Sequence, residues 1–392
     1  MTFFRLAIVI SHPIQYYAPL FKILAGQNHL KLKVFYTLGE NEHLIDDGFK
    51  KKIAWDIPLL SGYEYEFLQN TAKKPGSHHF MGIDNPFLID KLKAFTPNAI
   101  LIYGWSYLSH FRTIMYFNKK IPLWFRGDST LIDQQPLFRA ALKTILLGWV
   151  YRHVEKAFFV GQNSKAYFKH YGLKEQQLVF APHSIDNKRF SIDRKTEAEQ
   201  LRKKFNISDS EILVLFSGKF EKKKDPLILL EAFCKLNKVG LHLLFVGNGV
   251  LEKELKERAH KQAGVNAYSN IHFLGFQNQS VMPTIYQACD LFCLPSQGPN
   301  ETWGLSVNEA MASSRAILVS DKVGCAIDLV TPQKNGYIFK SNDLDDLTNK
   351  LDILTNNFNE LTKMGAYSNI SIQNWSLQQQ AAAYIEQTQN AK

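Results

Sequence analysis

Short apolar segments alternate with amphipathic segments of helical period along the chain. Strands that are buried on both faces appear as short apolar runs, and a helix between two of them lets both strands run in the same direction. The pattern predicts an α/β fold built from parallel sheets, and it excludes an all-β or an all-α fold. The expected strands are 6–10, 32–36, 99–103, 123–125, 157–160 and 178–181 in the first half, and 212–217, 241–247, 271–274, 291–294 and 317–320 in the second.

Helices are expected between these strands, and some of their ends carry typical signals. The segment 164–172 begins with Ser164 as an N-cap and ends at Gly172. Asp343 and Asp345 have the form of a DxD metal motif, but they stand where a helix needs a cap, so we interpret the motif as a cap. The other expected helices are 18–24, 135–152, 226–236, 251–263, 282–288, 305–313, 345–355 and 376–387.

A break in the alternation divides the chain into two domains. Residues 181–190 interrupt the pattern, and the composition from Asp193 to Phe205 is polar and charged before a new strand begins. We expect one domain over 1–183, completed by a C-terminal helix within 375–392, and a second over 184–374. Two open parallel sheets predict ligand binding beyond the carboxyl ends of their strands, in a cleft between the domains.

Positive charge is concentrated in the first half. The net charge is +10; residues 1–183 hold 22 Lys+Arg against 13 Asp+Glu (+9), and residues 184–392 hold 24 against 23 (+1). A basic domain suits nucleic acid, anionic lipid or an acidic substrate. Nucleic acid is the least favoured partner, because no zinc-finger spacing, RNP-like string or helix-turn-helix signature is present. No apolar run reaches the ~20 residues that span a bilayer, and four cysteines without CxxC spacing indicate reduced core thiols of a cytoplasmic protein.

One stretch, from Leu294 to Ser314, predicts an anion-binding corner. A strand ends, a Pro/Gly/Asn loop follows, and a helix begins at Gly304, so the N–H groups of its first turn point beyond the strand end. Two carboxylates, Glu301 and Glu309, flank this corner. A single acid at a helix start more often complements the helix dipole on the surface, so the pair has to be judged with its surroundings.

Two further strand ends supply candidates for the same corner. After strand 212–217, Gly218 allows close approach of the backbone to a ligand, and Lys219 and Lys224 bring positive charge. A lysine-rich loop is commonly only solvated, but this one follows a strand end opposite a predicted anion site. Gly247-Asn-Gly249 is a second such turn; it lacks the third glycine of a dinucleotide fingerprint, which argues against NAD.

These strings together resemble the donor domain of GT-B glycosyltransferases, specifically the retaining family 4 group (glycosyl transferases group 1). Such proteins have two Rossmann-like α/β/α domains that face each other across a cleft. The resemblance extends over about residues 213–339, with Lys219 in place of the usual Arg and Trp303 where Phe is commoner. The matching strings are Gly218-Lys219 with Lys224, Val246-Gly-Asn-Gly249, His272-Phe-Leu-Gly275-Phe276, Tyr286…Asp290…Leu294-Pro-Ser296, Glu301…Glu309 and Asp321…Gly324…Asp328…Asn335-Gly336.

The resemblance implies a transferase that uses a nucleotide-sugar, a UDP- or GDP-sugar, without a metal or other cofactor. Glu301 is then expected to contact donor-sugar hydroxyls and Glu309 the ribose, while Lys219, Lys224 and the N–H groups after Thr302 stabilise the diphosphate leaving group. Transfer is expected to retain the anomeric configuration. Catalytic roles fall to Glu301, Lys224 and Lys219, and the full expected donor site is Gly218, Lys219, Lys224, Gly247, Asn248, Glu301, Thr302, Trp303, Gly304, Leu305 and Glu309.

The first half resembles the family less closely, and we expect it to bind the acceptor. Ser11-His-Pro-Ile-Gln-Tyr-Tyr-Ala-Pro19 is similar to the opening of a bacterial branch, and Phe125-Arg-Gly-Asp128 stands where other members often carry a His facing the sugar. The acceptor-side candidates are His12, Gln15, Arg126 and Asp128, with a purely structural role for His12 an open alternative.

The acceptor itself is expected to be a glycan or a lipid-linked molecule, in cell-surface polysaccharide or glycolipid synthesis. Between Pro136 and Lys156, Phe138, Leu142, Ile145 and Trp149 recur at helical spacing among basic residues. Such a stripe belongs either to the core or to an anionic membrane surface, which would hold the protein at the inner face of the plasma membrane. The competing interpretations are a GT-B nucleotide-sugar epimerase or hydrolase and a non-catalytic GT-B binding protein.

Overall fold

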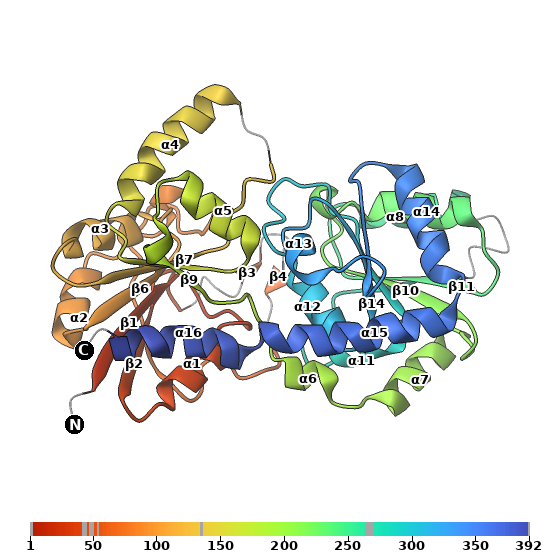
Figure 1. Cartoon of the computed structure of the whole chain (residues 1–392), viewed down its shortest axis with the longest axis horizontal. Helices are drawn as coiled ribbons and strands as arrows, with labels where there is room; N and C mark the ends of the chain where they lie inside the picture. Colours follow the sequence, from red (N-terminus) through yellow and green to blue (C-terminus); the bar gives the residue numbers. More distant parts are fainter. Residues whose placement is uncertain are drawn as a thin grey trace. The chain divides into compact units, whose positions relative to one another are not determined.

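The computed structural model describes residues 3–40, 45–46, 51–52, 55–133, 136–262 and 270–390. The chain forms two compact units: unit 1 is Met1–His183 with Leu377–Lys392, and unit 2 is Ser184–Ser376. Figure 1 shows an α/β fold in each unit, with helices packed on a central sheet. The predicted fold class, α/β units with parallel sheets, is confirmed.

Unit 1 is built on a seven-stranded parallel sheet of order β5-β2-β1-β6-β7-β8-β9. Its strands are β1 (Phe4–Ile10), β2 (Leu30–Tyr36), β5 (Glu64–Phe67), β6 (Ala99–Tyr103), β7 (Leu123–Gly127), β8 (Lys156–Phe159) and β9 (Leu178–Phe180), and β3 (Ile45–Asp46) pairs with β4 (Lys51–Lys52) in a separate antiparallel pair. The helices are α1 (Ala18–Ala25), α2 (Leu88–Phe95), α3 (Leu108–Phe117), α4 (Leu137–Tyr151), α5 (Gln162–His170) and α16 (Leu377–Asn390), with short 3₁₀ turns η2 (Phe80–Gly82) and η3 (Glu175–Gln177).

The alternation of side chains along β1 divides the core of unit 1 into two layers. Leu6 and Ile8 pack with α1 and with the tail helix α16, whereas Ala7 and Val9 pack with α2, α3, α4 and α5. Tyr384 of α16 is fully buried and lies 4.3 Å from Phe158, ring centre to ring centre. The last helix of the chain is therefore part of the core of the unit that begins at the N-terminus.

Unit 2 is built on a six-stranded parallel sheet of order β12-β11-β10-β13-β14-β15. Its strands are β10 (Ile212–Ser217), β11 (Leu241–Val246), β12 (Ile271–Leu274), β13 (Leu291–Leu294), β14 (Ala316–Ser320) and β15 (Gly336–Phe339). Its helices are α6 (Asn187–Ser191), α7 (Lys195–Lys204), α8 (Pro226–Leu236), α9 (Glu252–Gln262), α11 (Met282–Ala288), α12 (Leu305–Ala312), α13 (Ala326–Leu329), α14 (Leu344–Thr355) and α15 (Phe358–Ile372), with 3₁₀ turns η4 (Lys222–Lys224) and η5 (Gln373–Trp375).

The apolar runs predicted as strands all form strands, and the differences lie at element ends and in polar segments. Helix α5 begins two residues before Ser164, with Gly161 at its N-cap, so the predicted Ser cap is wrong; Ser164 instead accepts a hydrogen bond from the Val160 N–H at 3.2 Å. The elements that were not predicted include strands β5 and β15 and helices α7 and α15. Strand β5 gives no apolar run, because it alternates Glu with aromatic residues and lies exposed or half-buried. The cap prediction at Asp343 is confirmed by its acceptance from the Asp346 N–H at 3.0 Å. All four cysteines are free thiols, three of them buried.

Each sheet has one point where the chain changes direction of travel across it. In unit 2 the chain adds β11 and β12 on one side of β10 and then β13, β14 and β15 on the other. In unit 1 the corresponding change lies between β1 and β6. Loops that leave adjacent strands at such a switch point diverge, and open parallel sheets bind ligands there.

Candidate functional site

The candidate site lies at the switch point of unit 2, beyond the carboxyl ends of β10 and β13. The loop after β10 contains Lys219 and continues into η4, and the loop after β13 contains Glu301 and continues into α12. The Gln297 N–H donates to the Lys223 carbonyl at 2.9 Å, and the Gln297 side-chain amide donates to the Lys222 carbonyl at 2.7 Å. The two predicted halves of the site are thus joined through their backbones.

An ion pair connects the two loops at the centre of this site. The Lys224 ammonium lies 2.5 Å from Glu301 Oε2, and the Ser296 hydroxyl donates to the same oxygen at 3.0 Å. Burial by itself raises the pKa of the Glu301 carboxyl, but the Lys224 ammonium, helped by Lys223 and Ser296, outweighs it, so the pKa of Glu301 lies below its ordinary value of 4.5. Glu301 is a buried carboxylate that stays ionised because Lys224 accompanies it.

The loop between Glu301 and Gly304 is fixed by the turn after β14. The Gly324 N–H donates to the Glu301 carbonyl at 3.0 Å, and the Cys325 N–H donates to the Trp303 carbonyl at 2.9 Å. Gly304 has φ +98°, which favours glycine, and a Cβ there would meet the Val323 side chain at 2.9 Å. Since Gly304 is the N-cap of α12 and has no side chain, the first N–H groups of this helix keep their capacity to bind an anion.

Glu309 is held one helical turn further along α12. Its Oε2 accepts a hydrogen bond of 2.8 Å from the hydroxyl of Tyr286, and both side chains are buried. Between the two glutamates, the indole N–H of Trp303 donates to Asn308 Oδ1 at 2.9 Å, and its ring lies 5.2 Å from the ring of Trp375. Tyr286, Ser296 and Asn308 were not predicted as part of the site, although Tyr286 and Ser296 stand within the strings that carry the family resemblance.

Gly247 and Asn248 support the loop that contains Lys219. A Cβ on Gly247 would lie 2.0 Å from the Gly218 carbonyl oxygen, and the Phe220 N–H donates to the Asn248 carbonyl at 2.9 Å. The Asn248 side chain accepts from the Phe276 N–H at 2.6 Å and donates to Glu252 at 2.9 Å. The side chain of Asn248 is therefore engaged with the framework, and its backbone holds the β10 loop in position.

Replacing Gly324 with Ala tests the contact between the β14 turn and the Glu301 loop. A Cβ would lie 1.8 Å from the Thr302 carbonyl oxygen, which is impossible without backbone movement. We expect a loss of roughly 2–3 kcal/mol of stability and a displaced Glu301, measured by thermal unfolding and by nucleotide binding. Gly26→Ala, whose Cβ would meet nothing closer than 3.6 Å, is the matched control. Unchanged unfolding of the Gly324 variant would contradict the contact.

In unit 1, the acceptor-side candidates His12 and Gln15 follow β1 at its switch point. Both are half-buried, and His12 Nδ1 lies 3.0 Å from the Ser11 hydroxyl. Asp128 follows β7 and is half-buried as well. Burial raises the pKa of Tyr17 to about 12. The Asp128 carboxylate adds to this increase, and the positive charge of Arg126 opposes it.

Arg126 has a different position from these three residues. Its side chain is 1% exposed and donates to the Ala181 carbonyl at 2.9 Å and the Pro182 carbonyl at 3.3 Å. The guanidinium also lies 5.8 Å from the centre of the Tyr17 ring. Arg126 therefore secures the segment that follows β9 to the sheet and does not present its charge at the surface.

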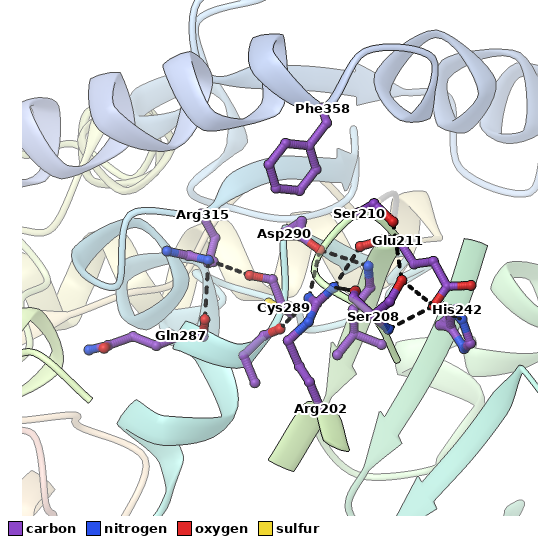
Figure 2. Close-up of polar contacts among 12 residues, drawn as sticks. Arg202, Ser208, Ser210, Glu211, His242, Gln287, Cys289, Asp290, Arg315 and Phe358 are labelled. Carbon is purple, nitrogen blue, oxygen red and sulfur yellow. Dashed lines mark hydrogen bonds and ion pairs between the residues drawn. The ribbon is translucent and has the colours of Figure 1, made fainter. Parts of the chain in front are cut away.

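Figure 2 shows a second polar cluster in unit 2, centred on Arg202 and Asp290. Asp290 Oδ2 accepts from Arg202 at 3.0 Å and from the Leu213 N–H at 2.8 Å. Glu211, Asp290 and Arg315 directly precede β10, β13 and β14, so the cluster lies at the amino ends of the strands, at the edge opposite Lys224. Arg202 also donates to the carbonyls of Ala288 (2.9 Å), Ser208 (2.8 Å) and Glu211 (2.6 Å). This cluster satisfies buried backbone groups at the opposite edge from the candidate site.

In the part of the chain that the structure describes, no three His, Cys, Asp or Glu side chains come together as a metal-binding group. Among the helices of the described residues, none is long and apolar enough to cross a bilayer.

Comparison with known proteins finds similarity in both units. Residues 197–370 match the family model described as glycosyl transferases group 1. The mannosylfructose-phosphate synthase of Agrobacterium fabrum is 28% identical over 229 residues, which cover 55% of this chain and 49% of the relative. A Campylobacter jejuni enzyme, N,N'-diacetylbacillosaminyl-diphospho-undecaprenol alpha-1,3-N-acetylgalactosaminyltransferase, is 28% identical over 233 residues, covering 58% of each chain. The matched region thus spans about half the length of these relatives.

The fold of the whole chain is also found among solved structures. The Anabaena protein HepE in complex with UDP superimposes with a TM-score of 0.73 and 16% identity, covering 99% of this chain and 100% of HepE. At this level of identity the likeness concerns the fold, and it includes both units.

Proposed function

We propose that this protein is a glycosyltransferase that moves a sugar from a UDP- or GDP-sugar to an acceptor, because residues 197–370 match the family model described as glycosyl transferases group 1. The observation that carries the proposal is the Lys224–Glu301 ion pair beside the start of α12, where no side chain caps the helix. A diphosphate leaving group needs positive charge and N–H donors at one point, and a sugar needs a fixed hydroxyl acceptor next to it. Lys224, α12 and Glu301 provide these three features together.

The reaction we propose retains the anomeric configuration. The bond between the anomeric carbon and the phosphate oxygen breaks, and its electron pair leaves with the diphosphate. The acceptor oxygen bonds to the anomeric carbon on the same face, and its proton passes to the departing phosphate. Lys224, Lys219 and the first N–H groups of α12 stabilise the charge that develops on the diphosphate, so we propose that the reaction needs no divalent metal or other cofactor. Glu301 holds donor hydroxyls and Glu309, oriented by Tyr286, holds the ribose.

The acceptor proposed is a glycan or a lipid-linked molecule, in cell-surface polysaccharide or glycolipid synthesis at the cytoplasmic face of the plasma membrane. The name of the Campylobacter relative supports this class, because it transfers to a diphospho-undecaprenol-linked sugar. The name of the Agrobacterium relative, a synthase of a sugar phosphate, indicates a small phosphorylated product instead. The net charge of +9 in residues 1–183 suits an anionic acceptor or surface.

Thermal unfolding with UDP, GDP, ADP and CMP tests the donor site. One nucleotide is expected to stabilise unit 2 by RT ln(1+[L]/Kd), about 2.7 kcal/mol at a hundredfold excess over Kd. Glu309→Ala should lose this preference, with Kd raised roughly tenfold to hundredfold, because a buried carboxylate that binds hydroxyls is gone. Glu257→Ala, an exposed glutamate of α9, is the control. Stabilisation by none of the four nucleotides would favour a non-catalytic binding protein.

A donor screen with anomer-resolved NMR of the product, run with and without EDTA, tests the reaction itself. Retention without a metal requirement is the expected result. Consumption of the donor without transfer to any acceptor would favour an epimerase or hydrolase. An inverted product or loss of activity in EDTA would contradict the corresponding part of the proposal.

A further inference from the structure

Helix α4 is apolar on two opposite faces, and only one of them is covered. Leu147, Val150 and Tyr151 are buried in the core of unit 1. Phe138 and Ile145 are 75% and 73% exposed, and Leu142 and Leu146 are exposed with them. At about 100° per residue, positions 138, 142 and 145 project on the side opposite 147. Figure 1 shows the first turns of α4 (yellow) extending beyond the other elements of unit 1.

The exposed face, which we call the outer face of α4, continues across neighbouring elements. Trp149 lies near the C-terminal end of this face and packs against Phe111 of α3, with 5.6 Å between ring centres. Phe111 in turn packs against Phe80 of η2 at 5.8 Å, and Phe80 and its neighbour Met81 are exposed. Isolated exposed apolar residues are ordinary, but a continuous apolar surface on three elements indicates an interaction site.

The segments that form this surface are basic. The three segments that form it, 70–82, 105–121 and 136–156, hold nine Lys and Arg and one acid, Glu155, a net +8. The ring of His153 packs edge-on against Trp149, with 5.3 Å between ring centres. The pKa of His153 is lowered, mainly by burial and further by the positive charges of Arg152 and Lys119. Lys120 lies 3.9 Å from the centre of the Tyr116 ring. Three of these cations are engaged within unit 1: Arg112 pairs with Asp84, Lys143 lies over the rings of Tyr167 and Tyr171, and Lys156 donates to the Gln176 carbonyl.

We propose that the outer face of α4, with Phe111 and Phe80, is the surface by which this protein docks on an anionic lipid bilayer. Phe, Leu and Ile side chains enter the boundary between headgroups and acyl chains, Trp149 lies at headgroup level, and the surrounding Lys and Arg side chains bind anionic headgroups. A second copy of the chain is disfavoured, because it would bring two basic surfaces together. The docking rests on the proposed function only in that it brings unit 1 to a lipid-linked acceptor.

Co-sedimentation of the full chain with vesicles tests the docking. Vesicles of phosphatidylcholine mixed with phosphatidylglycerol should bind the protein at low salt, and vesicles of phosphatidylcholine alone should bind it far less. Ile145→Ser is expected to lower binding roughly tenfold. The matched control is Ile370→Ser, which changes an isoleucine of equal exposure (71%) on α15 of unit 2 and should leave binding unchanged.

The charge component is tested in the same assay. Lys119→Ala with Lys120→Ala should weaken binding to anionic vesicles by roughly fivefold per lysine, while Lys253→Ala, an exposed lysine of α9, should not. High salt should reduce the difference between these variants.

Three results would overturn the docking proposal. They are no binding to anionic vesicles at low salt, equal loss of binding in the Ile145 and Ile370 variants, and a dimer in light scattering that Ile145→Ser dissociates while vesicle binding persists. Nucleotide stabilisation separates this proposal from the proposed function, because Ile145→Ser should keep it. Vesicle binding without stabilisation by any nucleotide would support the docking proposal and contradict the proposed transferase activity.

Discussion

Replacing Lys224 with Met is expected to lower the rate of sugar transfer by roughly 10²–10³-fold. The change removes the ammonium that would stabilise the departing diphosphate, and it leaves Glu301 buried without its partner, 2.5 Å away in the wild type. Initial rates of nucleotide release measure the effect. Lys222→Met is the control, because Lys222 lies in the same turn but its side chain is exposed. A rate close to that of the wild type would remove Lys224 from the mechanism.

The same variant should change the dependence of stability on pH. In the wild type the pKa of Glu301 lies below its ordinary 4.5, so its carboxylate stabilises the fold above that pH and this contribution is lost as the pH falls through the lowered pKa. Without Lys224, burial dominates and raises the pKa of Glu301, so the variant loses stability as the pH rises above about 4.5. The difference in unfolding temperature should therefore widen from acid to neutral pH. A constant difference would mean that the two side chains are not coupled.

Replacing Arg202 with Met should destabilise unit 2 by about 3–5 kcal/mol. The guanidinium donates to three carbonyls and to Asp290, which is itself largely buried (Figure 2). Hydrogen exchange of the Leu213 amide, which donates to Asp290, gives a local measure that does not depend on two-state unfolding of the whole chain.

Two comparisons make this result specific to the buried cluster. Arg258→Met removes an arginine with two carboxylate partners, Glu231 and Glu254, that is 41% exposed, and it should cost less than about 1 kcal/mol. Adding Asp290→Leu to the Arg202 variant should recover part of the loss, because no unpaired buried charge remains. Equal effects of the two arginine variants would contradict the importance of burial.

The positions of the candidate-site residues could be predicted from the sequence because their signals are local. A strand end, a glycine and a helix start follow one another within a few residues, so Gly218, Lys219, Glu301 and Gly304 can each be placed at the carboxyl edge of a sheet without a structure. Strand β5 was missed for a related reason: its two glutamates leave no apolar run to recognise, although the register pairs it with β2.

What each of these residues contacts was decided by the tertiary structure. Lys224 and Glu301 are separated by 77 residues of sequence and meet only because β10 and β13 are neighbours in the sheet. Tyr286, Ser296 and Asn308 hold the site residues through contacts that no spacing rule encodes. Asn248 and Arg126 carry polar groups suited to ligands, and only the fold directs them to the backbone instead.

The sequence by itself determined the two parallel-sheet units, the strand ends that bear the site and the excess positive charge of the first half. The tertiary structure decided which of the polar groups are paired and which of two apolar faces of α4 is covered. Helical period identifies an apolar face, but it cannot say which face meets the core when both sides of the helix are apolar. Only the packing of Leu147 and Val150 inward leaves Phe138 and Ile145 exposed on the opposite side.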